Sequence, residues 1–258
     1  MIEKPFYVIE FNAVACFLNI RVNDVPVLSA NIEGQVSSMV QINNAIIESG
    51  EQHVTYYILP ILGEFSLQSE TFFEASLWLY DASGEEIEKK EEINKVTMPE
   101  NTGIPLPVFK AEKFFIAEVP YKLNAWQYSQ DLTKVDDLRE KVDSLYRKIE
   151  EMFANGQYDR FINLIQKRED NIAICMYLTE EEKKERITML SNVLKKRFEI
   201  IPTSPKDIML IFGHNRLVSL VKTDGTSALM LKDPETETDL WIDMKLHLKP
   251  GDTELSII

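Results

Sequence analysis

Alternating apolar and polar positions dominate the first 120 residues of the chain. In residues 53–59, Val54, Tyr56 and Ile58 occupy every second position, which is the period of a strand with one buried face. Several further runs of this kind follow one another, and turn residues separate them. We therefore predict an antiparallel β-sandwich-like domain over residues 1–125.

Two of the alternating runs place a tryptophan on their polar face. In residues 73–79 the apolar positions leave Trp78 on the opposite face, and in residues 240–248 they leave Trp241 there. The second run is the clearest strand pattern in the chain, and it predicts one continuous strand. An outward tryptophan is either an anchor for a partner or a side chain that a helix or the second sheet covers.

The middle of the chain changes to the three-four spacing of helices. From Val135 to Met152 the apolar residues form one stripe on a helix of about five turns. A second helix is expected from Tyr158 onward. Thr179 and Glu182 have the spacing of a capping box, which predicts the start of a further helix.

Short strands return after this helical segment. Residues 208–212 are wholly apolar, and Asp224-Gly225 is a hairpin signal between two strand-like runs. The helices and these strands make a second predicted domain over residues 126–258. The expected fold class is therefore α+β: an N-terminal antiparallel β-sandwich-like domain, a central helical segment and a C-terminal antiparallel β-sheet.

The charge of the chain limits its partners. The formal net charge is -14, from 28 basic and 42 acidic residues, and residues 1–129 alone hold 8 basic and 18 acidic side chains. Nucleic acids and anionic membrane surfaces require basic patches, so we expect neither as a partner. An acidic protein suits a basic protein partner, although acidic surfaces also keep proteins soluble.

Four carboxylates alternate near the C-terminus: Asp233, Glu235, Glu237 and Asp239. The spacing resembles that of a calcium loop, but Thr238 and Met244 stand where an EF-hand needs glycine and glutamate. We interpret the run as an acidic hairpin tip. Together with Trp78 and Trp241, these four residues are the candidate contacts with a partner.

No residue pattern indicates catalysis. His53, His214 and His247 have no histidine or cysteine at metal-ligand spacing. The chain also lacks a nucleophile elbow, a phosphate-binding loop and a dinucleotide fingerprint. We therefore predict a non-enzymatic protein with no catalytic residue, no metal site and no cofactor.

The cysteines and the N-terminus bear on the compartment. Cys16 and Cys175 lie far apart among apolar residues, which favours buried thiols in a reducing compartment. No run approaches the roughly 18 apolar residues of a membrane span. Residues 13–16 resemble a lipoprotein cleavage box, but Glu10 and Asn12 interrupt the preceding run. The prediction is a retained strand in a cytoplasmic protein.

Several short pieces of the chain carry a resemblance to a known group. The pieces are Val22-Asn23-Asp24-Val25-Pro26-Val27, Ile42-Asn43 with Ile46-Ile47, Ser49-Gly50-Glu51-Gln52 before a strand that ends at Pro60, Ala228-Leu229-Met230-Leu231-Lys232-Asp233, and Asp239-Leu240-Trp241-Ile242-Asp243. They resemble bacterial immunity proteins encoded near secreted interbacterial toxins. The resemblance implies a toxin-binding role, but its motifs are turns and strands and carry no functional residue across.

These features lead to one functional prediction and two alternatives. We predict a binding protein that neutralises a secreted toxin by occluding a basic surface. The alternative is a carbohydrate- or ligand-binding β-sandwich accessory protein, which would present a concave aromatic strip on one sheet. An enzyme is the third interpretation, and a pocket in which His53 and carboxylates converge would favour it.

Overall fold

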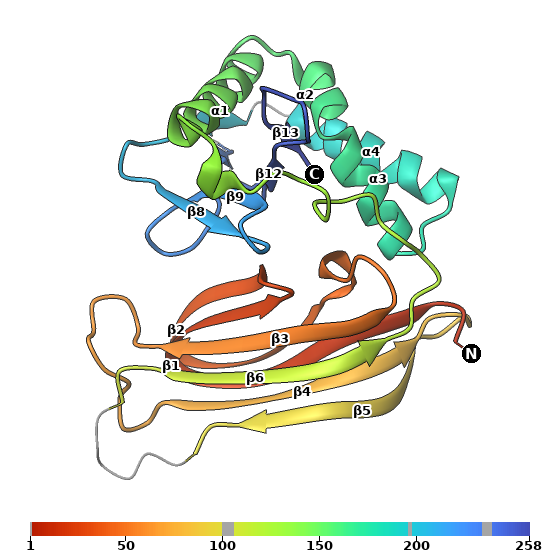
Figure 1. The fold of residues 1–258 in the computed structure, drawn as a ribbon, viewed down its shortest axis with the longest axis vertical. Coiled ribbons are helices and arrows are strands. Elements are labelled where there is room, and N and C mark those ends of the chain that lie inside the picture. Colours follow the sequence, from red (N-terminus) through yellow and green to blue (C-terminus); the bar gives the residue numbers. More distant parts are fainter. Residues whose placement is uncertain (1, 100–105, 196–197, 234–238) are drawn as a thin grey trace. The chain divides into compact units, whose positions relative to one another are not determined.

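The computed structural model describes residues 2–99, 106–195, 198–233 and 239–258. The chain divides into two compact units, unit 1 (Met1–Leu123) and unit 2 (Asn124–Ile258). Both units contain antiparallel sheets, and the described part of unit 2 adds four α-helices (Figure 1). The predicted α+β class is therefore confirmed.

Unit 1 is one antiparallel sheet. Its strands are β1 (Pro5–Val22), β2 (Val25–Gln41), β3 (Gly50–Leu59), β4 (Phe72–Asp81), β5 (Glu88–Thr97) and β6 (Phe109–Ala117), with a short 3-10 helix, η1 (Asn43–Ala45), after β2. The strand order is β5-β4-β1-β3-β6, and β2 also pairs with β1. β1 is thus the strand around which the sheet is built.

Both edges of β1 are occupied. One edge pairs with β2 from Val8 to Val22. The other edge is shared, because β4 pairs with residues 5–14 and β3 pairs with residues 17–22. β5 then extends the sheet beyond β4, and β6 extends it beyond β3. A strand of 18 residues can hold two successive neighbours in this way.

A bend at Ala15 separates the two halves of β1. Ala15 has a left-handed φ of 46°. The register with β2 shifts at the same place, since Val14 pairs with Gln35 whereas Cys16 pairs with Ile32. Two residues of β2 therefore oppose one residue of β1. The extra residue of this β-bulge lies in β2, opposite the bend in β1.

The bend also changes which positions of β1 face the core. The fully buried side chains are odd-numbered before it and even-numbered after it: Ile9, Ala13, Cys16, Leu18, Ile20 and Val22. A regular strand would keep one parity throughout. The left-handed conformation of Ala15 therefore shifts the alternation by one residue and keeps both halves of β1 turned toward the apolar interior.

The alternation predicted in residues 53–59 is confirmed on β3. Val54, Tyr56 and Ile58 are fully buried. The ring of Tyr56 lies 5.6 Å from that of Phe73 on β4, centroid to centroid, so β3 and β4 contribute to one core. The alternate positions of β3, which include His53 and Tyr57, face away from this core.

Unit 2 combines helices with two small sheets. After η2 (Leu132–Lys134) come the helices α1 (Leu138–Ala154), α2 (Tyr158–Leu164), α3 (Gln166–Cys175) and α4 (Glu180–Leu194). The strands are β7 (Glu199–Ile201), β8 (Ile208–Phe212), β9 (Leu217–Val221), β10 (Met230–Lys232), β11 (Asp239–Trp241), β12 (Leu246–His247) and β13 (Ser256–Ile257). The sheet orders are β11-β10-β7 and β13-β12-β9-β8.

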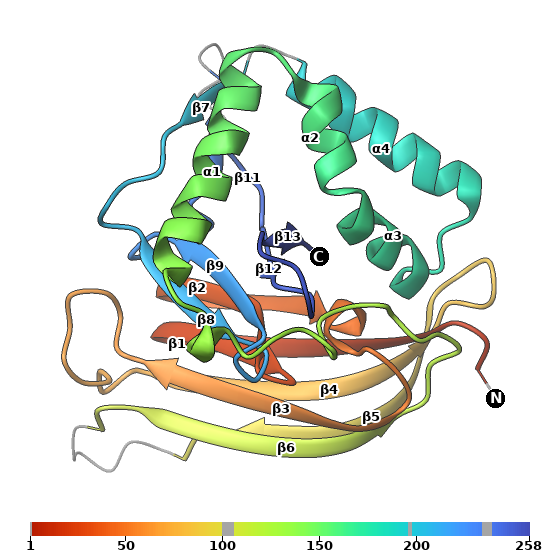
Figure 2. The ribbon, with the colours of Figure 1, turned by 45° about the horizontal axis from the view of Figure 1, so that its top comes forward.

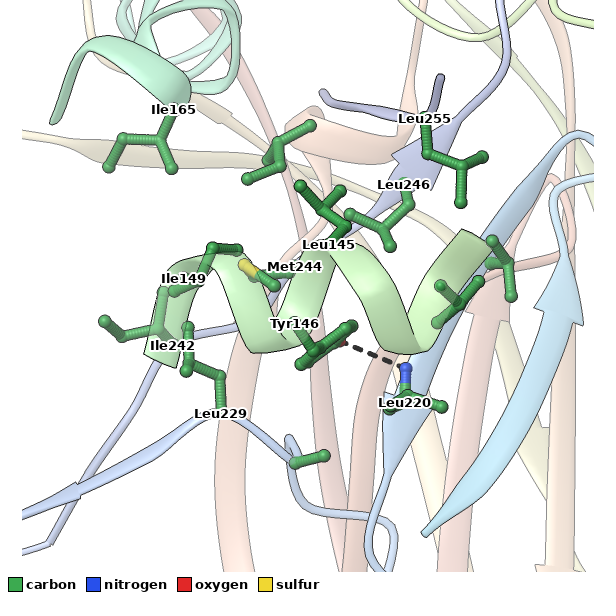
Figure 3. Packing of buried hydrophobic residues seen from close by; sticks show 14 of the residues in the cluster. Leu145, Tyr146, Ile149, Ile165, Leu220, Leu229, Ile242, Met244, Leu246 and Leu255 are labelled. Carbon is green, nitrogen blue, oxygen red and sulfur yellow. Dashed lines mark hydrogen bonds between the residues drawn. The ribbon is translucent and has the colours of Figure 1, made fainter. Parts of the chain in front are cut away.

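Helix α1 packs its apolar stripe on these strands. Leu145, Tyr146 and Ile149 are buried in one cluster with Leu229 and Met244, as Figure 3 shows. The stripe predicted from the sequence is therefore confirmed. α1 begins at Leu138 rather than Val135, and the preceding residue has a left-handed φ of 56° that a helix cannot contain.

The alternating run at residues 240–248 forms two strands where one was predicted. β11 ends at Trp241 and pairs with β10, whereas β12 begins at Leu246 and pairs with β9 and β13. Ile242 and Met244, between the two strands, are buried in the same core. The alternation thus reflects the burial of one face of an extended segment, which leaves one sheet after β11 and enters the other at β12.

Two further sequence predictions concern helices. The capping box is confirmed: Thr179 accepts a hydrogen bond from the backbone N–H of Glu182, whose side chain accepts from the backbone N–H of Thr179. No helix in the described ranges is long and apolar enough to cross a membrane.

Candidate binding surface

The outward face of β3 and β6 carries aromatic and aliphatic side chains that the core does not use. The two strands lie side by side in both Figure 1 and Figure 2. Phe114 and Ile116 of β6 point outward and are 61% and 64% exposed. We call this surface the β3–β6 face and define it by His53, Tyr57, Glu112, Phe114 and Ile116.

Strand register brings His53 against Phe114. The two residues are direct partners across the β3–β6 ladder. Their rings stack with centroids 4.5 Å apart and an angle of 14° between the ring planes. The backbone N–H of His53 also donates to Asn23 Oδ1 at 3.1 Å. The stacking places the imidazole flat beside the exposed phenyl ring, and the hydrogen bond fixes the backbone of β3 at His53.

The other end of the face is cationic. Tyr57 pairs with Lys110 across the ladder. The Lys110 ammonium lies 5.5 Å from the centre of the Tyr57 ring, and the Arg21 guanidinium lies 5.7 Å from it. Both distances are within the range of cation–π attraction. Tyr57 is therefore in contact with two cations. Phe114 stacks on His53 with one face of its ring, and 61% of the residue remains exposed.

Carboxylates surround Phe114 and Ile116. Glu112 precedes Phe114 on the same outward row, Glu51 lies directly opposite Ile116, and Glu118 follows just beyond it. All three are exposed. Glu112 Oε1 lies 2.7 Å from Lys110 Nζ, and this hydrogen bond lowers the pKa of the Glu112 carboxyl. The apolar pair thus has a rim of carboxylates, of which Glu112 is paired with Lys110.

Trp78 of β4 is one of the predicted partner contacts. The side chain is half-buried, and the Lys89 ammonium of β5 lies 3.7 Å from the centre of its ring. Lys89 is fixed by hydrogen bonds of 2.8 and 2.7 Å to the two carboxylate oxygens of Glu10. One face of the tryptophan ring is therefore covered by a lysine of the adjacent strand in the same sheet, and not by a helix or a second sheet.

The remaining sequence candidates lie in unit 2. Trp241 is 46% exposed at the end of β11, and Asp239 lies on the same strand two residues earlier. Asp233 follows the end of β10, the strand paired with β11. Glu235 and Glu237 lie outside the described residues. Trp241 and Asp239 thus share one hairpin, and Trp78 belongs to the other unit.

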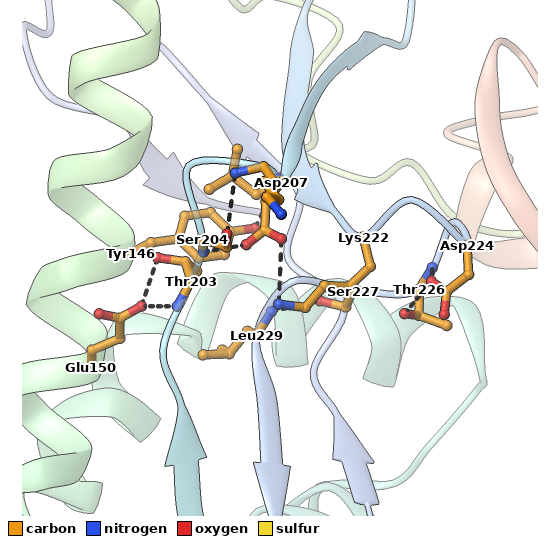
Figure 4. Close-up of polar contacts among 12 residues, drawn as sticks. Tyr146, Glu150, Thr203, Ser204, Asp207, Lys222, Asp224, Thr226, Ser227 and Leu229 are labelled. Atoms are coloured by element: carbon orange, nitrogen blue, oxygen red, sulfur yellow. Dashed lines mark hydrogen bonds and ion pairs between the residues drawn. The ribbon is translucent and has the colours of Figure 1, made fainter.

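A polar cluster in unit 2 is paired within the protein (Figure 4). Glu150 of α1 accepts hydrogen bonds of 2.7 Å from both the backbone N–H and the hydroxyl of Thr203. Buried Asp207 accepts from the backbone N–H of Ser204 at 2.7 Å and lies 3.3 Å from Lys222 Nζ. These contacts join the segment before β8 to α1 and β9, so we interpret them as structural.

A buried serine and histidine also meet in unit 2. His247 Nδ1 lies 2.7 Å from Ser129 Oγ, and Arg216 donates to the carbonyl oxygen of Ser129 at 2.6 Å. Ser129 and His247 are only 5% and 2% exposed. Burial lowers the pKa of His247 to about 4, so the ring is neutral at pH 7. Both side chains of the pair are therefore buried.

Other reactive groups are similarly enclosed. Cys16 and Cys175 are free and fully buried, and burial raises the pKa of each thiol to about 11. Both therefore stay protonated near neutral pH. Within the described residues, no three or more His, Cys, Asp or Glu side chains are grouped to hold a metal ion.

The β3–β6 face was missed in the sequence although a signal for it exists. Residues 114–117 are four consecutive apolar residues in a strand. A strand of an open sheet buries one face, so alternate members of such a run must lie outside the core. Phe115 and Ala117 took the inner positions, and Phe114 and Ile116 took the outer ones.

Comparison of the chain with protein-family models, curated proteins and solved structures finds no match. The resemblance of short segments to immunity proteins therefore stays a prediction.

Proposed function

We propose that this chain is a non-enzymatic binding protein that neutralises a secreted bacterial toxin by covering a basic surface. The observation that carries the proposal is the exposure of Phe114 and Ile116 on a regular strand with carboxylates around them. An apolar centre with a charged rim is the usual anatomy of a protein–protein interface.

The apolar pair supplies the affinity in this proposal. Aromatic side chains near the centre of an interface often contribute most of the binding free energy, because a partner excludes water from them. Phe114 is held in place by the stacked His53 ring, so little side-chain entropy is lost when a partner binds. Ile116 continues the same row on β6 and enlarges the patch.

In this proposal the carboxylates determine which kind of partner binds. The rim of Glu51, Glu112 and Glu118 lies on a unit whose sequence holds 18 acidic and 8 basic residues. A negative field of this kind steers a basic partner and raises its association rate, most strongly at low ionic strength. The two buried, unpaired cysteines are consistent with the proposed cytoplasmic location.

The test is capture of a partner by the tagged protein in a lysate of its native cells, with titration of the captured protein. We expect one basic partner whose binding weakens as salt rises. Phe114→Ala should weaken binding about 30-fold, which corresponds to roughly 2 kcal/mol for an interface hot spot. Unfolding free energy should change by less than about 0.5 kcal/mol, because the side chain is exposed.

Two matched variants locate the contact. Phe65→Ala removes a phenyl group that is 95% exposed in the loop after β3, and it should leave affinity unchanged. Trp241→Ala tests the contact predicted on the β10–β11 hairpin of unit 2. Full affinity after Phe114→Ala and Ile116→Ala would rule out the β3–β6 face as the binding site. Loss of affinity after Trp241→Ala would place the binding site on the hairpin instead.

A second candidate function rests on the aromatic rings of the same face. Tyr57, His53 and Phe114 present rings on adjacent strands, and aromatic rings are common platforms for sugars. A carbohydrate- or ligand-binding role predicts saturable glycan binding by the purified chain that Tyr57→Ala abolishes. Glycan binding unaffected by this change, or no glycan binding at all, would leave only the protein partner.

A further inference from the structure

The free edge of β2 differs from the other two edges of unit 1. β2 hydrogen-bonds to β1 along one side, and no other described strand pairs with it. Residues 33–39 are exposed on both faces. The edge therefore presents backbone N–H and C=O groups in extended conformation, which is a template for another strand.

Charged residues protect the two other edge strands. β5 carries Glu88, Lys89, Lys90, Glu91, Glu92 and Lys95, and β6 carries Lys110, Glu112 and Lys113. Such charges discourage pairing between sheet edges. Residues 35–41 of β2 contain no charged residue and no proline, although the chain carries a net charge of -14. Among the described edge strands, β2 therefore has a seven-residue segment, residues 35–41, without this protection, although Pro26 and Glu33 lie earlier in the strand.

The sequence of this edge is nearly the same read in either direction. Residues 35–41 are Gln-Val-Ser-Ser-Met-Val-Gln. If two copies pair antiparallel about Ser38, Gln35 lies opposite Gln41 and Val36 lies opposite Val40. Only Ser37 and Met39 meet a different residue type. Valine pairs directly across a ladder are favourable, and no like charges face one another.

The faces of the strand also fit this register. Val36 pairs with Ala13, and Val40 pairs with Ile9, both of which point into the core of unit 1. A second copy would therefore place its valines next to the existing apolar layer. Gln35 and Ser37 share the opposite face, where both donate to Asn12 Oδ1 at 3.3 Å. Valines would thus meet on one face, and the polar Gln35 and Gln41 would meet on the other, with Ser37 opposite Met39 between them.

We propose that β2 is a homodimer interface, in which the edge Gln35–Gln41 pairs antiparallel with the same segment of a second copy about a two-fold axis at Ser38. This pairing joins two six-stranded sheets into one. The arrangement is closed, because a two-fold axis uses the same edge on both copies and leaves none for a third.

A cysteine at the axis tests the register. Identical residues across an antiparallel pair have Cα atoms about 4.5–5.5 Å apart, which is within the reach of a disulfide. Ser38→Cys should therefore form a covalent dimer in mild oxidant. Ser69→Cys, in the exposed loop before β4, is the control and should stay monomeric under the same conditions. Native Cys16 and Cys175 are fully buried and should not interfere.

A mixed pair of variants makes the register test sharper. Ser37 and Met39 are opposite one another in the proposed dimer, so a chain with Ser37→Cys and a chain with Met39→Cys should cross-link when mixed. Each alone should cross-link several times more slowly, because its cysteine then faces a residue without a thiol. Equal rates in all three samples would overturn the register.

Charge changes test the dimer without any cross-link. Purified full-length protein is followed by sedimentation velocity over a range of concentrations, and the mass should rise from 29.8 kDa to twice that value. Ser37→Lys with Met39→Lys puts like charges opposite each other and should keep the protein monomeric. Ser37→Lys with Met39→Glu puts opposite charges there and should restore the dimer, which controls for misfolding.

The proposal fails if the wild-type chain is monomeric at every concentration, or if both charge variants dimerise equally. These measurements use the purified chain alone. Their outcome is therefore independent of whether a toxin binds the β3–β6 face.

Discussion

His247 and Ser129 lie 118 positions apart in the sequence, yet the imidazole Nδ1 is 2.7 Å from the serine hydroxyl oxygen. Burial lowers the pKa of His247 from 6.5 to about 4, and Lys249 lowers it further, while Asp252 acts in the opposite direction. The folded protein therefore holds this ring neutral at pH values where the unfolded chain binds a proton.

This difference makes the stability of unit 2 depend on pH. Between pH 6.5 and about 4 the unfolded state binds more protons than the folded state, so stability falls as the pH falls through this window. The shift corresponds to roughly 3 kcal/mol. We expect His247→Asn to remove most of this dependence. The check is urea unfolding at pH 7, 5.5 and 4.5 in a Trp78→Phe background, where tryptophan fluorescence reports unit 2. A slope unchanged by His247→Asn would contradict the prediction.

The hydroxyl of Tyr146 supports a backbone group in the core of unit 2. It accepts a hydrogen bond of 3.1 Å from the N–H of Leu220, drawn as a dashed line in Figure 3. Tyr146→Phe leaves that buried donor without a partner, so unfolding free energy should fall by about 1–3 kcal/mol. Tyr128→Phe removes a hydroxyl from an exposed ring and should have no measurable effect in the same denaturant titration. Equal stabilities of the two variants would count against this role.

The bend in β1 depends on a left-handed residue. Ala15 has a φ of 46°, a conformation that glycine adopts freely and β-branched residues adopt at high cost. Ala15→Val should destabilise unit 1 by more than about 2 kcal/mol, because valine is strained there and its site is buried. Ala15→Gly should change stability by less than about 1 kcal/mol. Thermal unfolding of the two variants checks the prediction, and a tolerated valine would exclude strain at this bend.

The cover over Trp78 depends on Lys89. Removing the ammonium and its contacts with Glu10 should lower stability by about 1 kcal/mol, since the pair is partly exposed. Lys89→Ala should also increase quenching of tryptophan fluorescence by acrylamide. Lys184→Ala, on the exposed side of α4, is the matched control and should leave quenching unchanged. Unchanged quenching in both variants would mean that other residues cover the ring.

Local patterns predicted much of the fold because they report burial. The alternation of Val54, Tyr56 and Ile58 and the stripe of α1 were read correctly, since each depends on one face meeting one core. The prediction of one continuous strand over residues 240–248 was wrong, because alternation does not reveal that β11 and β12 pair in different sheets. Partner strands are chosen by tertiary contacts that no window of sequence contains.

The surface was harder to predict than the core. Trp78 and Trp241 share the same local pattern, yet Lys89 covers one and the other is 46% exposed. The deciding side chain comes from a different strand, so the sequence around each tryptophan could not distinguish them. The outward position of Phe114 was not predicted at all, because an apolar residue within an apolar run gives no local sign of which face it occupies.

The central place of β1 has a consequence for the nascent chain. β1 is synthesised before the strands that pair with it, but its second edge is complete only after β4, which ends at Asp81, has left the ribosome. At about 5–20 residues per second, the β1–β2 hairpin waits on the order of seconds with apolar side chains uncovered. This hairpin is thus the segment of the growing chain on which a chaperone would act.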